Sequence, residues 1–251
     1  MRSFYESFLA ALVSFTRIPV RRPLPDAAFR NAVWHLPTLG ALLLSLQAPV
    51  LWLFSGPQPN PVRAGLLLLL PILFTGALHE DGLADVWDAV GATSDRDRRL
   101  EIMKDPRIGS FGVLALIMTL GLSWACLSSI PEHLLLPALL VSQTGSRWVA
   151  LAIVSRLPYL TRKDSRAAAY LPQPGLSLGF WGATCLVIAV TLLCLPLPQA
   201  LLALVLSICL QQLAWAYLRK HFGAYTGDFL GAIIKMSELS LLLFFFWAFR
   251  S

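Results

Sequence analysis

Carboxylates are concentrated in one short stretch of this chain. Eight of its fourteen acidic residues fall there: Glu80, Asp81, Asp85, Asp88, Asp95, Asp97, Glu101 and Asp105. Asp81, Asp85 and Asp88 are spaced i, i+4 and i+7, so a helix would place all three on one face. Carboxylates that close repel one another unless a cation lies among them. Mg²⁺ accepts one or two protein carboxylates and completes its shell with water and substrate phosphate, so the pattern predicts a magnesium site suited to a diphosphate.

The later acids of this stretch have a simpler explanation. Asp95, Asp97 and Glu101 lie beside several basic residues at helical spacing. Ser94 followed by Asp97 is typical of a capping box, which would begin a second helix running from Asp95 to Met103. We expect these acids to stabilise that helix.

Groups that could handle phosphate and protons flank the acids. Lys104 and Arg107 could bind phosphate oxygens or stabilise charge on a leaving group, and anchoring at the membrane face is the alternative. His79 directly precedes the acidic face and could act as a general base, with a hydrogen-bonded structural histidine as the alternative.

A second polar insertion interrupts the last apolar run. Asp228 stands in a glycine-flanked turn and could complete a metal or ribose site. Glu238 follows inside the apolar run, and Arg147 lies inside an earlier one, where a charge is costly and by default indicates function. For Arg147, structural pairing and contact with an anionic substrate are both open.

The elements that must position these residues are membrane helices. Hydrophobic residues make up 57% of the 251 residues and charged residues 14%, with a mean hydropathy of +0.67, which is outside soluble globular usage. Runs long enough to span a bilayer, about 20 residues each, occur at 34–55, 62–78, 110–130, 135–155, 180–196 and 198–218, with a shorter seventh at 238–250. The stretch from Phe4 to Val20, broken by Arg17 and Pro19, predicts an amphipathic or partly inserted helix. We therefore expect one all-α domain over 1–251, a polytopic membrane bundle of about six or seven spans with a cytoplasmic, helical active-site loop.

Basic residues predict the orientation of this bundle. They gather in alternate connections, including Arg162, Lys163 and Arg166 in one and Lys235 in another, while the 56–61 and 131–134 connections carry none. Positive charge is retained on the cytoplasmic side, so the amino terminus and the long loops are expected there. The net charge of +6 is then a consequence of topology, and no nucleic-acid partner is expected.

Four blocks of residues, in order, resemble the cobalamin synthase family, the adenosylcobinamide-GDP ribazoletransferases, over nearly the whole chain. The blocks are Phe15-Thr16-Arg17-Ile18-Pro19-Val20; His79-Glu80-Asp81-Gly82-Leu83-Ala84-Asp85 with Asp88; Leu100-Glu101-Ile102-Met103-Lys104-Asp105 with Arg107-Ile108-Gly109; and Thr226-Gly227-Asp228 with Leu230-Gly231-Ala232 and Glu238. Three positions depart from the family pattern. Pro106 replaces the usual Ser, Lys235 stands where the residue is often acidic, and the position of Glu80 is not always acidic.

The resemblance implies the last assembly step of the vitamin B12 coenzyme. The ribose hydroxyl of α-ribazole, or of its 5′-phosphate, would attack the cobinamide-linked phosphate of adenosylcobinamide-GDP and expel GMP, with Mg²⁺ required. A multi-pass protein of the bacterial cytoplasmic membrane is expected, which could form a homo-oligomer.

The residue roles expected on this basis fall into three groups. The metal ligands are Asp81, Asp85, Asp88 and Asp228, with Glu80 as the weaker one. The catalytic residues are Lys104 and Arg107 on phosphate and His79 or Asp105 as proton acceptor. The substrate-binding residues are Arg17, Arg147, Thr226 and Glu238.

Two other classes were weighed against this one. A CDP-alcohol phosphotransferase also places spaced aspartates at cytoplasmic helix ends, but its D-G-x-x-A-R pattern is absent from the segment between Asp81 and Asp85. An ion-coupled transporter would use intramembrane carboxylates such as Glu238 and should show repeated halves. The sequence shows no such repeat.

Overall fold

The computed structural model describes residues 2–56, 60–160 and 175–249. Arg162, Lys163 and Arg166, which were assigned to a basic loop, lie outside these ranges. Every regular element within the ranges is a helix. The helices are α1 (Arg2–Phe15), α2 (Asp26–Ala32), η1 (Val33–His35), α3 (Leu36–Leu53), α4 (Pro61–Thr75), α5 (Leu78–Ala92), α6 (Arg96–Ile102), α7 (Ser110–Ser129), α8 (Glu132–Val154), α9 (Leu178–Cys194), α10 (Leu197–His221) and α11 (Gly227–Ala248).

The prediction of an all-α, multi-pass membrane protein is confirmed. In the described part of the chain, five continuous helical segments are long and apolar enough to cross a bilayer: Asp26–Leu53, Ser110–Ser129, Glu132–Val154, Leu197–His221 and Gly227–Ala248. Helices α4 and α5 would make a sixth span together, but they meet at a bend of 91°. Helix α9 is apolar and shorter, at 17 residues.

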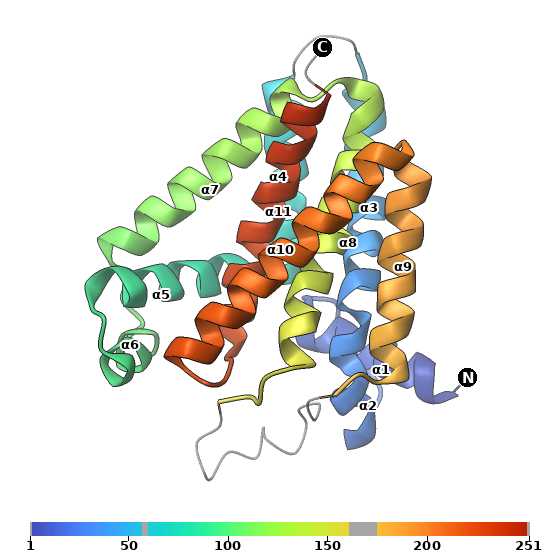
Figure 1. Cartoon of the computed structure of the whole chain (residues 1–251). Coiled ribbons are helices and arrows are strands. Elements are labelled where there is room, and N and C mark those ends of the chain that lie inside the picture. Colours follow the sequence, from blue (N-terminus) through green and yellow to red (C-terminus); the bar gives the residue numbers. More distant parts are fainter. Residues whose placement is uncertain (1, 57–59, 161–174, 250–251) are drawn as a thin grey trace.

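Helix α8 lies at the centre of the bundle. It packs against α3, α9, α10 and α11, and almost every residue of its second half is buried. Helix α11 packs on α8 along one side and on α5 and α7 along the other. Figure 1 shows α5 running sideways to the bundle, at a steep angle to its long helices, with α6 below it and α7 rising from the same corner. Helix α5 is therefore not part of the five continuous spans.

The last span begins earlier than hydropathy indicates. The sequence placed it near 238–250, whereas α11 starts at Gly227. Lys235, assigned to a loop, therefore lies inside α11 and is buried at 6% exposure. That assignment was wrong because the polar side chains of this helix lower its hydropathy, although the helix turns them toward its neighbours instead of toward lipid.

Backbone conformation sets the sharp turn between α4 and α5. Gly76 ends α4 in the left-handed region, and the N–H of Ala77 donates to the carbonyl of Ile72 at 2.9 Å, as in a Schellman cap. Ala77 itself has φ of 61°, the only positive φ of a described residue other than glycine. A left-handed alanine costs about 1–2 kcal/mol, so this bend stores strain immediately before the acidic face.

The short helix predicted after α5 is present as α6, with a different cap. Asp95, not Ser94, caps it, because the Asp95 side chain accepts the N–H of Arg98 at 2.8 Å. Arg99 is buried and donates to the carbonyl of Thr93 at 2.6 Å and to the Tyr217 hydroxyl at 3.3 Å. These bonds tie α6 to α10 and so fix the start of the α6–α7 connection.

Candidate active site

Two carboxylates project from the first half of α5. Asp81 is exposed and Asp85 is half-buried, one helical turn apart. Both belong to the helix that the sequence predicted from their spacing. Within the described ranges, neither makes an ion pair with a basic side chain, so both are available to a ligand.

Glycines bring a third carboxylate against them. Gly82 faces the first turn of α11, and a methyl group added there would lie 2.7 Å from the Asp228 carbonyl oxygen. Gly231 faces the backbone of His79 in the same way, at 3.1 Å. With a side chain at neither glycine, the backbones of α5 and α11 touch. Asp228, from a turn more than 140 positions away in the chain, therefore joins the carboxylates of α5.

The charges of this acidic cluster, formed by Asp81, Asp85 and Asp228, act on one another. Partial burial, together with the smaller effects of the Asp81, Asp228 and Asp88 carboxylates, raises the pKa of Asp85 to about 6. A carboxyl group held near pKa 6 is a carboxylate that lacks a stabilising positive charge. The cluster has the electrostatic character of a cation site.

The chemistry of these donors is that of hard oxygen ligands, which Mg²⁺ prefers. In the described ranges, no group of three or more His, Cys, Asp or Glu side chains is arranged so that it could hold a metal ion. Mg²⁺ does not need a complete protein cage, because it keeps several waters and takes one or two carboxylates together with substrate phosphates. The mutual repulsion within the acidic cluster and the hard oxygen chemistry of its members both suit this ion.

Asp88 is placed differently from the other acids of α5. Its two carboxylate oxygens accept the backbone N–H groups of Gly109 at 2.7 Å and Gly112 at 2.8 Å. The side chain is buried at 8% exposure and caps the first turn of α7, where a negative charge is favoured. The structure therefore gives Asp88 a structural contact in place of the open position expected for a metal ligand.

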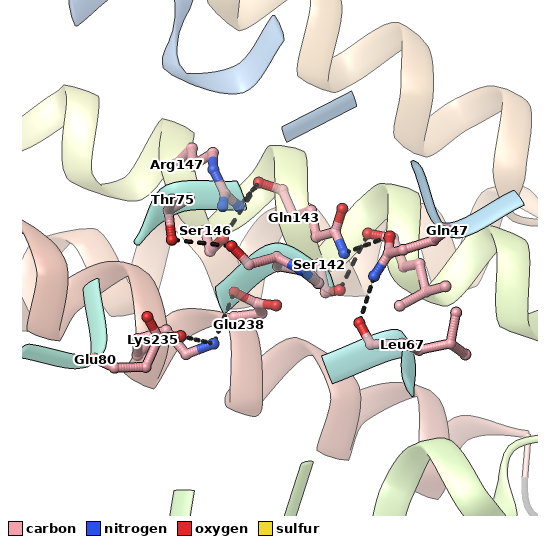
Figure 2. Close-up of polar contacts among 12 residues, drawn as sticks. Gln47, Leu67, Thr75, Glu80, Ser142, Gln143, Ser146, Arg147, Lys235 and Glu238 are labelled. Carbon is pink, nitrogen blue, oxygen red and sulfur yellow. Dashed lines mark hydrogen bonds and ion pairs between the residues drawn. The ribbon is translucent and has the colours of Figure 1, made fainter. Parts of the chain in front are cut away.

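Glu80 and Glu238 share one cation. Lys235 Nζ lies 3.1 Å from Glu80 Oε1 and 3.6 Å from Glu238 Oε2, and all three side chains are buried (Figure 2). Glu80 therefore points into the bundle, on the side of α5 away from the acidic cluster. Its second oxygen, Oε2, has no hydrogen-bond partner among the described residues.

Arg147 extends this buried network to α8. Its Nη1 donates to the carbonyl of Gln143 at 2.9 Å, and its guanidinium lies within electrostatic reach of Glu238 and Glu80. Figure 2 shows that the polar contacts continue beyond Arg147. The side-chain amide of Gln143 donates to Gln47 at 2.9 Å, and the Gln47 amide donates in turn to the carbonyl of Leu67. The charges of Arg147 and Lys235 balance those of Glu80 and Glu238. Arg147 and Glu238, which were expected to bind substrate, therefore have partners within the protein.

His79 faces the same interior. Burial lowers the pKa of its imidazole well below the usual value, and the charges of Arg147 and Lys235 lower it further. The imidazole is therefore neutral, but its nearest charges are these two cations and not the acidic cluster. The structure does not bring His79 to the carboxylates that it precedes in sequence.

The three remaining catalytic candidates lie together on the α6–α7 connection. Arg107 grips the carboxylate of Asp105 with both Nε, at 2.9 Å, and Nη2, at 2.6 Å. This hydrogen bonding lowers the pKa of Asp105 to about 2, which makes it a weak proton acceptor. Lys104 is exposed and forms no ion pair among the described residues, so it is the free cation of this connection.

The last two candidates border the elements of the acidic cluster. The backbone N–H of Arg17 donates to the carbonyl of Phe74 at 2.8 Å, and its side chain packs on Gly76 at the α4–α5 bend. Thr226 caps α11 by accepting the N–H of Phe229 at 3.3 Å, and its hydroxyl donates to Asp228 at 3.4 Å. Thr226 thus supports the carboxylate that α11 contributes.

Two residues at the site were missed from sequence. Lys235 was counted as a loop cation, although its spacing of three from Glu238 inside an apolar run was a signal of a buried pair. Tyr159, in the segment that follows α8, lies beside Asp228 and Gly227. No local pattern marks it, because it reaches the site only through the fold.

Comparisons with known proteins converge on one family. The family model described as cobalamin-5-phosphate synthase matches residues 7–246. A protein of Bradyrhizobium diazoefficiens named adenosylcobinamide-GDP ribazoletransferase is 37% identical over 239 residues, 93% of this chain and 90% of the relative. Proteins with the same name from Vibrio cholerae (35% identical, 97% of this chain, 94% of the relative) and Thermosynechococcus vestitus (32% identical, 98% of each chain) are also similar. No solved structure matches the chain.

Proposed function

The chain belongs to the cobalamin-5-phosphate synthase family, and from that membership we propose that it catalyses the adenosylcobinamide-GDP ribazoletransferase reaction with Mg²⁺ bound at the acidic cluster. The acceptor is α-ribazole or α-ribazole 5′-phosphate, and the products are adenosylcobalamin or its 5′-phosphate and GMP. The reaction is the last assembly step of cobalamin.

The single observation that carries the metal proposal is the acidic cluster itself. Three carboxylates from two helices act on one another and none forms an ion pair with a basic side chain among the described residues; burial first, and then the charges of the neighbouring carboxylates, raise the pKa of Asp85. A diphosphate substrate carries more negative charge into the same place. Such a site is suited to a diphosphate only if a cation accompanies it.

The bond changes define what the site must do. The ribose hydroxyl oxygen forms a bond to the cobinamide-linked phosphorus and its proton passes to water, while the bond from this phosphorus to the bridging oxygen breaks and GMP leaves with the electron pair. One or two of Asp81, Asp85 and Asp228 would hold Mg²⁺, whose charge would offset that of the diphosphate oxygens. Lys104, exposed and free of an ion pair among the described residues, is the cation proposed to bind the phosphates.

Two of the expected roles are not carried into this proposal. His79 faces the interior cations, and the carboxylate of Asp105 is held by Arg107. Neither is presented to a hydroxyl at the acidic cluster. Arg147 and Glu238 act in the proposal by holding α8, α5 and α11 together and not by contacting substrate.

The same reasoning places the protein in the cell. The proposal puts it in the bacterial cytoplasmic membrane, with the amino terminus and the acidic cluster on the cytoplasmic side, where positive loops are retained and nucleotides are found. The mass of the purified particle in detergent reports whether it acts as a homo-oligomer. Ion-coupled transport gains no support from Glu238, because Lys235 already compensates this carboxylate.

The test is GMP release by purified protein in liposomes, supplied with adenosylcobinamide-GDP and α-ribazole 5′-phosphate, with and without Mg²⁺. We expect GMP in equal amount to a cobalamin product, only when Mg²⁺ is present. Turnover that survives complete chelation would remove the metal from the proposal. A folded sample that makes no product under any condition would remove the activity.

A further inference from the structure

The segment after α8 is pinned to the turn before α11. Leu160 N–H donates to the carbonyl of Tyr225 at 2.7 Å, and Tyr225 N–H donates to the carbonyl of Pro158 at 3.0 Å. These two bonds make an isolated parallel bridge between Tyr159 and Tyr225. The two rings pack edge to face, with centroids 5.3 Å apart. Tyr159 therefore has a fixed backbone and a fixed ring.

This anchoring delivers the Tyr159 hydroxyl to the edge of the acidic cluster. The backbone N–H of Gly227 lies against the phenol oxygen, and Asp228 is the next residue. Gly227 and Asp228 form the first turn of α11, the turn that touches α5 at Gly82. The hydroxyl thus lies on the α11 side of the carboxylates proposed to hold Mg²⁺.

The Tyr159 hydroxyl can donate a hydrogen bond to a ligand. Its oxygen faces the Gly227 N–H, and among the described residues the Tyr159 O–H donates to no protein acceptor. A tyrosine hydroxyl has an ordinary pKa of about 10, so the group is a neutral O–H near pH 7. The members of the acidic cluster are acceptors when ionised and have no proton to offer a phosphate.

A phosphate entering this site needs donors as well as a cation. We propose that the Tyr159 hydroxyl donates a hydrogen bond to a phosphoryl oxygen of the nucleotide-activated substrate and is a binding residue of the site. The inference rests on the proposed function and deepens it by naming a protein contact to the diphosphate. A hydroxyl that is fixed before the substrate arrives loses little freedom on binding.

The ring of Tyr159, and not its hydroxyl, contributes to the stability of the fold. Backbone bonds and edge-to-face packing against Tyr225 hold the segment, and phenylalanine can keep both. Gly227 is exposed, so water can take its N–H when the phenol oxygen is removed. Tyr159→Phe should therefore fold normally. Tyr225→Phe is the matched control, because it removes one hydroxyl from the neighbouring buried ring.

The experiment compares wild-type, Tyr159→Phe and Tyr225→Phe proteins in liposomes. For each, kcat and KM for adenosylcobinamide-GDP are measured at saturating Mg²⁺, together with the thermal midpoint and the Mg²⁺ concentration for half-maximal rate. A hydrogen bond to a charged phosphate predicts that kcat/KM falls roughly 10-fold to 100-fold in Tyr159→Phe. The thermal midpoint and the Mg²⁺ requirement should stay at wild-type values, and Tyr225→Phe should match wild type throughout. Calorimetric binding of adenosylcobinamide-GDP gives a second readout and should weaken in Tyr159→Phe alone.

The outcomes separate this inference from the proposed function. Wild-type turnover with unchanged kcat/KM and unchanged binding in Tyr159→Phe overturns the inference and leaves the function standing. A loss confined to the Mg²⁺ requirement also overturns it, because the hydroxyl would then be acting on Asp228 and not on phosphate. Absence of wild-type turnover is a failure of the proposed function and is visible before any variant is compared.

Discussion

Lys235 Nζ on α11 lies 3.1 Å from Glu80 Oε1 on α5, and neither side chain reaches solvent. The pair joins the helix that carries Asp81 and Asp85 to the helix that carries Asp228. Because Glu80 directly precedes Asp81 in the chain, the pair also sets how α5 is rotated about its axis.

Lys235→Met should destabilise the protein strongly. It leaves Glu80 and Glu238 as buried carboxylates without their shared cation, and breaking a buried pair in this way costs about 3–5 kcal/mol. The thermal midpoint in detergent measures the effect. Lys220→Met, at an exposed position in the last turn of α10, is the control and should unfold like wild type. Equal midpoints for the two variants would contradict the assignment of a structural ion pair.

Asp85→Asn should abolish the response to Mg²⁺ without unfolding the protein. A ligand that binds only the folded state raises its thermal midpoint, so wild type should be stabilised by added Mg²⁺ and the variant should not. Turnover should be lost with the metal response, and chelation should remove turnover from wild type reversibly. Asp97→Asn, an exposed acid paired with Arg96 on α6, is the control and should retain both. A normal Mg²⁺ response in Asp85→Asn would exclude this residue from the site.

Asp88→Asn should show the opposite pattern. The Gly109 and Gly112 N–H groups bond to different carboxylate oxygens, so in asparagine one of these two donors would face the amide NH₂ in place of an acceptor. We expect a loss of about 1–3 kcal/mol in stability from the unsatisfied groups. The stabilisation by Mg²⁺ should persist in thermal unfolding. Loss of that stabilisation, with the midpoint in metal-free buffer unchanged, would return Asp88 to the metal ligands.

Gly82→Ala should reduce turnover by separating two backbones. The new methyl group would meet the Asp228 carbonyl oxygen and Cα at 2.7 and 2.8 Å, so α5 and α11 must move apart. Overpacking of this kind costs about 1–3 kcal/mol and shifts the acidic cluster. Gly121→Ala, in α7 with no atom within 4 Å of the added methyl group, should instead be neutral or slightly stabilising. Similar kinetics in the two variants would show that the close crossing has no role in the site.

Hydropathy predicted the helices well because every side chain that faces lipid must be apolar. The apolar runs coincide with α3, α4, α7, α8, α9 and α10 to within a few residues, and the i, i+4, i+7 spacing placed Asp81 and Asp85 on one helix. The start of α11 was missed because a helix buried among other helices can carry polar side chains that do not face lipid. Its polar residues, Asp228, Lys235 and Glu238, face neighbours and not lipid.

The sequence could not predict which acidic side chains of α5 stay open to a ligand and which bond to the backbone. Asp85 and Asp88 have the same side chain on the same helix, yet one remains open and the other accepts two amides from residues 21 and 24 positions away. That difference depends on where the α6–α7 connection returns to α5. Lys104 and Arg107 differ for a similar reason, since only Arg107 has a carboxylate within its reach at Asp105.

The crossing at Gly82 has a consequence for ionic radius. Because backbone rests on backbone there, the gap between α5 and α11 cannot be narrowed by repacking side chains, and widening it breaks the contact. An ion shared by Asp85 and Asp228 must match a separation set by main-chain atoms. Oxygens lie 2.0–2.1 Å from Mg²⁺ and about 2.3–2.6 Å from Ca²⁺, so the larger ion must be accommodated by side-chain rotation alone. Under the proposed function, two glycines with no functional group of their own would therefore limit the size of the ion that the acidic cluster accepts.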